Sequence, residues 1–170
     1  NVMGSRGSVI PLFINQIKKN QKLTITNFKM SRFLMSLTDT VNLVYQALLY
    51  GKNGDIFVQK SPSATIEIIA KSLLKIFNKD NSFKNIGVRH GERLYEILIS
   101  KEEMLRTTKR KNYFIIKPDN YEQNFAKFFT KGQKNINQIE EYNSLNTKEL
   151  SLKETITLLK KQIKNEENKF

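Results

Sequence analysis

Cysteine is absent from the 170 residues, and so is tryptophan. Without cysteine the chain forms no disulfide and has no thiolate nucleophile, a composition typical of the reducing cytoplasm. No apolar run is long enough to cross a bilayer, and residues 1–6 are not followed by the apolar core of a signal peptide. We therefore expect a cytoplasmic protein that makes no membrane contact.

Residues that could hold a metal or a cofactor are also scarce. His90 is the single histidine, and no second ligand stands at the spacing of a metal site, so we expect no metal. Neither the GxGxxG pattern nor a Walker A loop occurs. No nucleophile stands with a base and a third, orienting group. The sequence therefore indicates no catalytic and no cofactor-binding residue in this chain.

Positive charge is present in excess, because 29 Lys and Arg stand against 16 Asp and Glu and give a formal net charge of +13. One hypothesis is a basic nucleic-acid-binding module. However, the lysines are scattered, and only residues 109–111 and 160–161 form clusters. The aromatic residues lie on apolar stripes rather than between lysines, where stacking platforms would lie. We expect no nucleic acid, and interpret the charge as a weak indication of an anionic ligand.

Strands alternate with helices in the sequence pattern, which predicts an α/β fold. Helices are expected over about 9–20, 39–50, 65–77 and 152–164, with N-caps at Ser8, at Thr38 or Asp39, at Thr65 and at Ser151. Strands are expected at 23–26, 55–58, 86–89 and 113–116. Segment 93–99 either pairs with 113–116 as a strand or forms a helix.

The composition changes at about residue 119 and becomes rich in Asn, Gln and Lys. We therefore divide the chain into residues 1–118 and a C-terminal extension, residues 119–170. Much of 120–137 is expected to be disordered. The helix at 152–164 carries an apolar stripe that needs a partner surface.

Five segments of the chain follow one another in the order of a known family's motifs. They are NVMGSRGSVIPLF (1–13), TITNFKMSRF (24–33), FVQKSPSATI (57–66), IGVRHGERLYE (86–96) and EYNSLNT (141–147). Together they resemble bacterial UDP-N-acetylglucosamine 4,6-dehydratases of the extended short-chain dehydrogenase/reductase superfamily, in particular the 5-inverting capsule-type branch. The chain departs from the family patterns TIT…MTRF, IGxRHGEKLYE and EYNSHNT at Ser31, Arg93 and Leu145.

This resemblance implies that residues 1–118 are the substrate-binding lobe of such an enzyme with the end of its Rossmann-type domain, and that the Rossmann half lies outside this chain. It also implies that the extension packs on a neighbouring subunit or closes over the active site. It implies a role in capsule or O-antigen polysaccharide synthesis, a UDP-N-acetylglucosamine or related UDP-sugar substrate, and a homo-oligomer, either a dimer or a hexamer. The cofactor would be NADP or NAD, held mainly by residues upstream of Asn1. We expect the chain alone to be inactive and to expose apolar helix faces. The alternative within the family is a UDP-sugar 4-epimerase.

Two arginines and a glutamate are the leading candidates for contacts with the UDP-sugar. Arg32 interrupts an apolar run, which is costly unless its charge is paired. It either contacts the diphosphate or forms an ion pair, for example with Asp39. Arg89 is expected at a strand end beside a glycine turn, where a guanidinium can bind a diphosphate bidentately. By resemblance Glu92 holds the uridine ribose; the alternatives are a salt bridge to Arg93 or a cap.

The resemblance adds five further candidates for substrate contact. Asn1 would lie at the mouth of the sugar pocket, near the nicotinamide. Ser8 and Val9 would border the uridine-phosphate end through backbone groups, although Ser8 is also placed to be only a helix cap. Thr24 and Thr26 share one face of an expected strand, so both would point either at the uracil or at solvent.

Overall fold

The computed structural model describes residues 2–118 and 139–167 and divides into two compact units. The first unit comprises Asn1–Thr40, Ser61–Glu96 and Ser144–Phe170, and the second comprises Val41–Lys60 and Ile97–Asn143. The mixed α/β composition predicted from the sequence is confirmed. Within the described ranges, no helix combines the length and the apolar character that a bilayer crossing requires.

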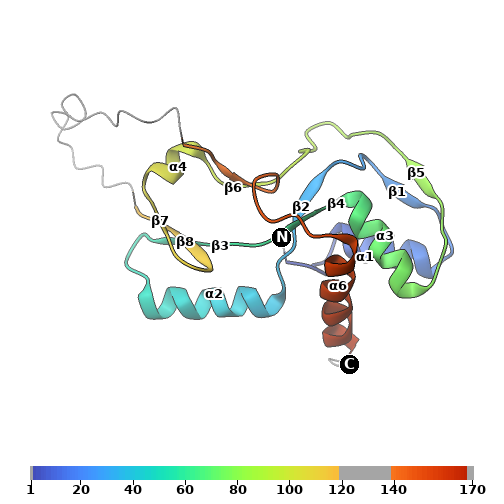
Figure 1. Cartoon of the computed structure of the whole chain (residues 1–170), viewed down its shortest axis with the longest axis horizontal. Helices are drawn as coiled ribbons and strands as arrows, with labels where there is room; N and C mark the ends of the chain where they lie inside the picture. Colours follow the sequence, from blue (N-terminus) through green and yellow to red (C-terminus); the bar gives the residue numbers. More distant parts are fainter. Residues whose placement is uncertain (1, 119–138, 168–170) are drawn as a thin grey trace. The chain divides into compact units, whose positions relative to one another are not determined.

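The elements are short and follow one another closely (Figure 1). The helices are α1 (Val9–Lys18), α2 (Leu37–Tyr50), α3 (Ile66–Phe77), α4 (Lys101–Leu105) and α6 (Leu152–Glu167). The strands are β1 (Leu23–Ile25), β2 (Ser31–Phe33), β3 (Ile56–Gln59), β4 (Ser63–Thr65), β5 (Phe83–Asn85), β6 (Ile97–Ile99), β7 (Thr107–Lys109), β8 (Tyr113–Ile116) and β9 (Tyr142–Asn143).

The core of the first unit lies between α1, α3 and α6. Phe13 of α1, Leu73 of α3 and Leu159 of α6 are fully buried there. Thr65 caps α3 as predicted, because its side chain accepts a hydrogen bond from the backbone N–H of Ile68. A cap of this kind fixes the start of α3 directly after β4.

Terminal helix α6 stands against α3 within the same unit (Figure 1). The predicted helix is confirmed. At its start the Ser151 hydroxyl accepts a hydrogen bond from the Glu154 N–H, and the Glu154 carboxylate accepts one from the Ser151 N–H. The apolar stripe of α6 has its partner surface within the unit, because Leu159 is buried in the core shared with α3, and packing of the extension on a neighbouring subunit or over the active site stays a prediction. The division of the chain after residue 118 stays a prediction, and residues 120–137 lie outside the described ranges.

Two strand pairs complete the first unit. β1 pairs with β5 in parallel, and β2 pairs with β4 antiparallel, with Arg32 opposite Ala64. The strand predicted at 86–89 is wrong: β5 ends at Asn85, and residues 86–96 form a loop. The reason is local, because Gly87 and Gly91 both have φ near +75°, which interrupts an extended strand.

The second unit contains a three-stranded antiparallel sheet in the order β3-β8-β7. The suggested pairing of 93–99 with 113–116 is wrong. β8 pairs with β3 and β7, whereas β6 pairs with β9. A capping box between Ser100 and Glu103 starts α4 directly after β6 and separates that strand from the sheet.

Helix α2 has no buried residue. It begins before both predicted caps, because the Ser36 hydroxyl accepts the N–H of Asp39 and the Asp39 carboxylate accepts the N–H of Ser36. The predicted end at Gly51 is confirmed. The apolar stripe of the helix is exposed, with Leu48 at 77%. The expected exposed apolar face is therefore found on α2, whereas α1, α3 and α6 bury theirs.

Candidate functional site

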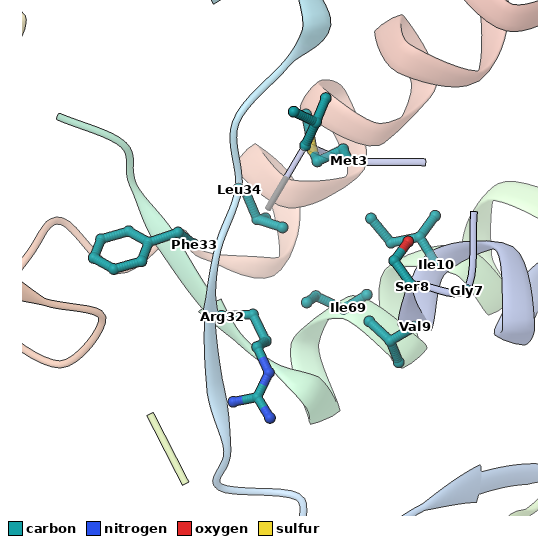
Figure 2. Close-up of a pocket in the computed structure, with 10 residues that line it drawn as sticks. Met3, Gly7, Ser8, Val9, Ile10, Arg32, Phe33, Leu34 and Ile69 are labelled. Atoms are coloured by element: carbon teal, nitrogen blue, oxygen red, sulfur yellow. The ribbon is translucent and has the colours of Figure 1, made fainter. Parts of the chain in front are cut away.

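A pocket of about 260 Å³ lies in the first unit, where the start of α1 meets β2 and α3 (Figure 2). Its lining residues are Val2, Met3, Gly7, Ser8, Val9, Ile10, Arg32, Phe33, Leu34 and Ile69. Figure 2 shows Arg32 extending from β2 and Ser8 and Val9 at the start of α1, with Ile69 of α3 between them. The structure thus brings together three of the predicted contacts, although Ser8 and Arg32 are 24 positions apart in the sequence.

The start of α1 faces this pocket with unused hydrogen-bond donors. Ser8 occupies the N-cap position, but its side chain makes no cap hydrogen bond, and its hydroxyl is buried without a partner among the described residues. Gly7 precedes it with φ +78°, and no acidic residue lies in the first turn. Because free N–H groups and the helix dipole favour anions, this end of α1 is suited to a phosphate or carboxylate.

Arg32 lines the pocket from β2, and its charge is partly balanced by neighbouring groups. Its Nη1 donates to the Ser31 carbonyl over 2.8 Å and its Nη2 to the Arg93 carbonyl over 3.0 Å. Its Nε lies 3.9 Å from a carboxylate oxygen of Glu96. The suggested ion pair with Asp39 is wrong, because Glu96 is the acidic partner of Arg32 and Asp39 bonds to Ser36 instead.

Loop 86–96 carries the other two charged candidates. The Glu92 carboxylate accepts the Thr26 hydroxyl over 3.0 Å with one oxygen and the Arg89 N–H over 3.1 Å with the other. Neither suggested alternative for Glu92, a salt bridge to Arg93 or a helix cap, is found. The Arg89 guanidinium is exposed and has no polar partner within residues 2–118 and 139–167.

The two predicted threonines have different surroundings. Thr26 bonds to Glu92. Thr24 is instead held by Gln16 of α1, whose amide nitrogen donates to the Thr24 hydroxyl over 2.8 Å and whose amide oxygen accepts the Thr24 N–H over 3.1 Å. Thr24 therefore ties β1 to α1. Asn1 lies outside the described residues.

Three residues at this site were not found by sequence reasoning: Gln16, Glu96 and Ser144. Glu96 and Ser144 belong to the quoted motifs, but their roles follow from contacts between segments far apart in the chain. The Ser144 hydroxyl lies 2.6 Å from that of Ser31 and accepts the Glu96 N–H over 2.9 Å. No local signal singles them out, because both motifs contain several other polar residues.

Comparison with known proteins shows the family. A family profile described as polysaccharide biosynthesis protein matches residues 1–118, and one described as polysaccharide biosynthesis protein C-terminal matches residues 119–162. The chain belongs to the polysaccharide biosynthesis protein family. The pocket and loop 86–96 both lie within the part that the first profile matches.

Two relatives from Rickettsia are named UDP-glucose 4-epimerase. The one from Rickettsia bellii (strain OSU 85-389) is 57% identical over 159 residues, which cover 94% of this chain and 47% of the relative. The one from Rickettsia prowazekii (strain Madrid E) is 50% identical, with 97% of this chain and 50% of the relative covered. The chain thus spans about half the length of the curated relatives it matches.

A solved structure has the same fold over nearly the whole chain. The X-ray structure of Pen from Bacillus thuringiensis superimposes with a TM-score of 0.78 and 36% identity. The match covers 95% of this chain and 47% of that one. The mixed α/β arrangement is therefore that of a part of a larger protein fold.

The sequence pattern that holds a dinucleotide in a Rossmann fold does not occur in this chain. Dinucleotide binding at a Rossmann fold uses a glycine-rich GxGxxG turn between a strand and a helix, and the sequence has no such pattern. Within the described ranges there is also no group of three His, Cys, Asp or Glu that could hold a metal ion. The candidate residues can bind a ligand: Ser8 and Arg32 can donate hydrogen bonds to an anion, and the Glu92 carboxylate can accept them from hydroxyl groups.

Proposed function

We propose that this chain is the UDP-sugar-binding part of a nucleotide-sugar 4-epimerase. The structural observation that carries the proposal is the pocket that the start of α1, with its unpartnered Ser8 hydroxyl, and Arg32 both line. The names of the relatives at 50–57% identity support 4-epimerisation as the reaction. The dehydratase reading suggested by the motifs becomes the second candidate.

In this proposal the diphosphate binds at the start of α1. The backbone N–H groups after Ser8 and the hydroxyl of Ser8 donate to phosphate oxygens, and Arg32 supplies positive charge at the same pocket. Arg89 can turn its unpaired guanidinium toward the ligand from loop 86–96. The two arginines thereby match the two negative charges of the diphosphate in a UDP-sugar.

Glu92 is proposed to recognise the ribose. Each of its oxygens accepts one hydrogen bond, from the Thr26 hydroxyl and from the Arg89 N–H. A carboxylate has about four lone pairs for accepting hydrogen bonds, so vicinal hydroxyls still find acceptors here. The same two contacts fix the carboxylate before the ligand arrives, which lowers the entropic cost of binding.

The residues of this chain bind and orient the substrate in this proposal, and the redox step is assigned to none of them. The nicotinamide cofactor would be held by the part of the whole enzyme that this chain does not span. A 4,6-dehydratase that acts on UDP-N-acetylglucosamine is the second candidate, favoured by the IGVRHGERLYE and EYNSLNT motifs. Both candidates use the same UDP-binding groups and differ in the product.

The test is a hybrid enzyme in which this chain replaces the matching region of the Rickettsia bellii relative. The hybrid is incubated with UDP-glucose and with UDP-N-acetylglucosamine, and the products are identified by mass spectrometry and NMR. The proposal predicts a product of unchanged mass with inverted C4. The unaltered relative serves as the control.

Two results would overturn the proposal. A product lighter by one water identifies the dehydratase. A folded hybrid that neither converts nor binds a UDP-sugar, while the control turns over, excludes both candidates.

A further inference from the structure

Glu96 joins loop 86–96 to β2 through both its side chain and its backbone. One carboxylate oxygen accepts the Phe33 N–H over 2.9 Å, and the other lies 3.9 Å from Arg32 Nε. The backbone N–H of Glu96 donates to the Ser144 hydroxyl over 2.9 Å. Glu96 therefore fastens the loop that carries Arg89 to the strand that carries Arg32.

The contacts of Arg32 leave part of its guanidinium for a ligand. Nη1 has two N–H groups and makes one hydrogen bond, to the Ser31 carbonyl, within the described part of the chain. Nη2 is held by the Arg93 carbonyl and the Met30 sulfur. The carboxylate of Glu96 lies on the Nε side. The guanidinium is thus held at Nε and at Nη2, while Nη1 has one N–H group left to donate to a ligand.

Buried serines support this arrangement from the segment at 141–147. Ser31 and Ser144 are 3% and 2% exposed, and their hydroxyl oxygens are 2.6 Å apart. The Ser144 backbone N–H also donates to the Glu96 carbonyl over 2.9 Å. Because buried hydrogen bonds are costly to break, Glu96 has little freedom to move away from β2.

We propose that Glu96 is a positioning residue for the diphosphate. Its carboxylate holds Arg32 in the orientation that presents Nη1 to a phosphate oxygen, and it keeps the Arg89 loop fastened beside β2. Glu96 itself does not touch the ligand. The inference rests on the proposed UDP-sugar site and assigns the site a supporting residue.

The experiment compares UDP with uridine, because only UDP carries the diphosphate. Calorimetric dissociation constants of both are measured for the full chain and for Glu96→Gln, whose amide oxygen still accepts the Phe33 N–H. A roughly three- to tenfold weaker UDP affinity is expected, the size of a lost partly exposed charge contact, with uridine changed less than about twofold. Glu67→Gln, which removes the same charge from an exposed pair with Lys71, is the control and should change neither.

A double-mutant cycle separates positioning from general structural support. If Glu96 acts through Arg32, Glu96→Gln added to Arg32→Gln should leave the UDP-to-uridine affinity ratio unchanged. Equal loss of both ligands, or no loss of either, overturns the inference. Absence of UDP binding in the unaltered chain instead refutes the proposed function. If circular dichroism shows that Glu96→Gln unfolds, Ser144→Ala takes its place, with the same expected selectivity for UDP.

Discussion

Substitution of Ser8 should affect the stability of the fold and the binding of UDP in opposite directions. Its hydroxyl is buried without a hydrogen bond, and it does not cap α1. A buried unpaired polar group costs about 1–3 kcal/mol. We therefore predict that Ser8→Ala leaves the free energy of unfolding unchanged or raises it, while weakening the binding of UDP. Urea unfolding and calorimetry measure the two effects.

Thr65 provides the matched control for Ser8. It caps α3 with a side-chain hydrogen bond to the N–H of Ile68. Thr65→Ala should therefore lower the free energy of unfolding by about 1 kcal/mol, as for other N-caps. Equal destabilisation by Ser8→Ala would show that the Ser8 hydroxyl has a partner in the folded state and is not reserved for a ligand.

At the residue scale, the sequence predicts the chemistry of the site better than its contacts. Ser8 and Arg32 were expected near a diphosphate, and they do line one pocket. The acidic partner of Arg32 was not found, because Glu96 lies 64 positions away and local spacing says nothing about such a contact. A motif identifies which residue types are present, but not which of their atoms meet.

Among the helices, α2 and α3 offer a direct contrast in burial. Leu48 of α2 is 77% exposed, and Leu73 of α3 is fully buried. We predict that Leu73→Ala lowers the free energy of unfolding by about 2–5 kcal/mol, because it removes apolar contacts and leaves a cavity. Leu48→Ala should change it by less than about 0.5 kcal/mol. Thermal or urea unfolding of both variants checks this, and a large loss with Leu48→Ala would contradict the exposure of α2.

The start of α6 should make the stability of the chain depend on pH. Lys148 donates to the Glu154 carboxylate over 2.7 Å, and Ser151 adds its N–H and its hydroxyl. These contacts lower the pKa of Glu154 from 4.5 to about 2. Since the pKa is lower in the folded state, the stabilisation is present above about pH 4.5 and is lost as the pH falls toward 2.

Glu154→Gln isolates this contribution. The variant should melt at a lower temperature than the unaltered chain near neutral pH, and the difference should shrink on acidification below about pH 4.5. Melting temperatures at a series of pH values measure it. A difference that stays constant or grows toward low pH would show that the Glu154 charge is not what stabilises the start of α6.

The elements that local patterns specify were predicted, and those fixed by distant pairing were not. Helices α3 and α6 follow from caps and apolar spacing. The strand expected at 86–89 fails because Gly87 and Gly91 adopt positive φ. The partner of β6 is β9, more than 40 residues later, with α4, β7 and β8 between them, and no sequence period reports such a pairing.

On the scale of the whole molecule, the net charge of +13 admits two explanations. A nucleic-acid module would use the charge to bind a phosphate backbone, and its affinity would fall steeply with salt. Membership of the polysaccharide biosynthesis protein family and the pocket beside Arg32 favour a small anionic ligand instead. The sequence alone predicts the α/β class and favours an anionic ligand over nucleic acid. It also predicts exposed apolar helix faces, but it does not indicate that α2 is the helix that carries one.

Calorimetric titration of the chain with UDP-glucose tests the central claim most directly. We predict saturable binding of one ligand per chain that UDP competes away, and loss of that binding in the double variant Arg89→Ala/Glu92→Ala, because it removes the unpaired guanidinium and the proposed ribose acceptor. Circular dichroism confirms that the variant is folded. Binding that survives both substitutions, or an unaltered chain that binds nucleic acid with steep salt dependence and no UDP-sugar, would contradict the account.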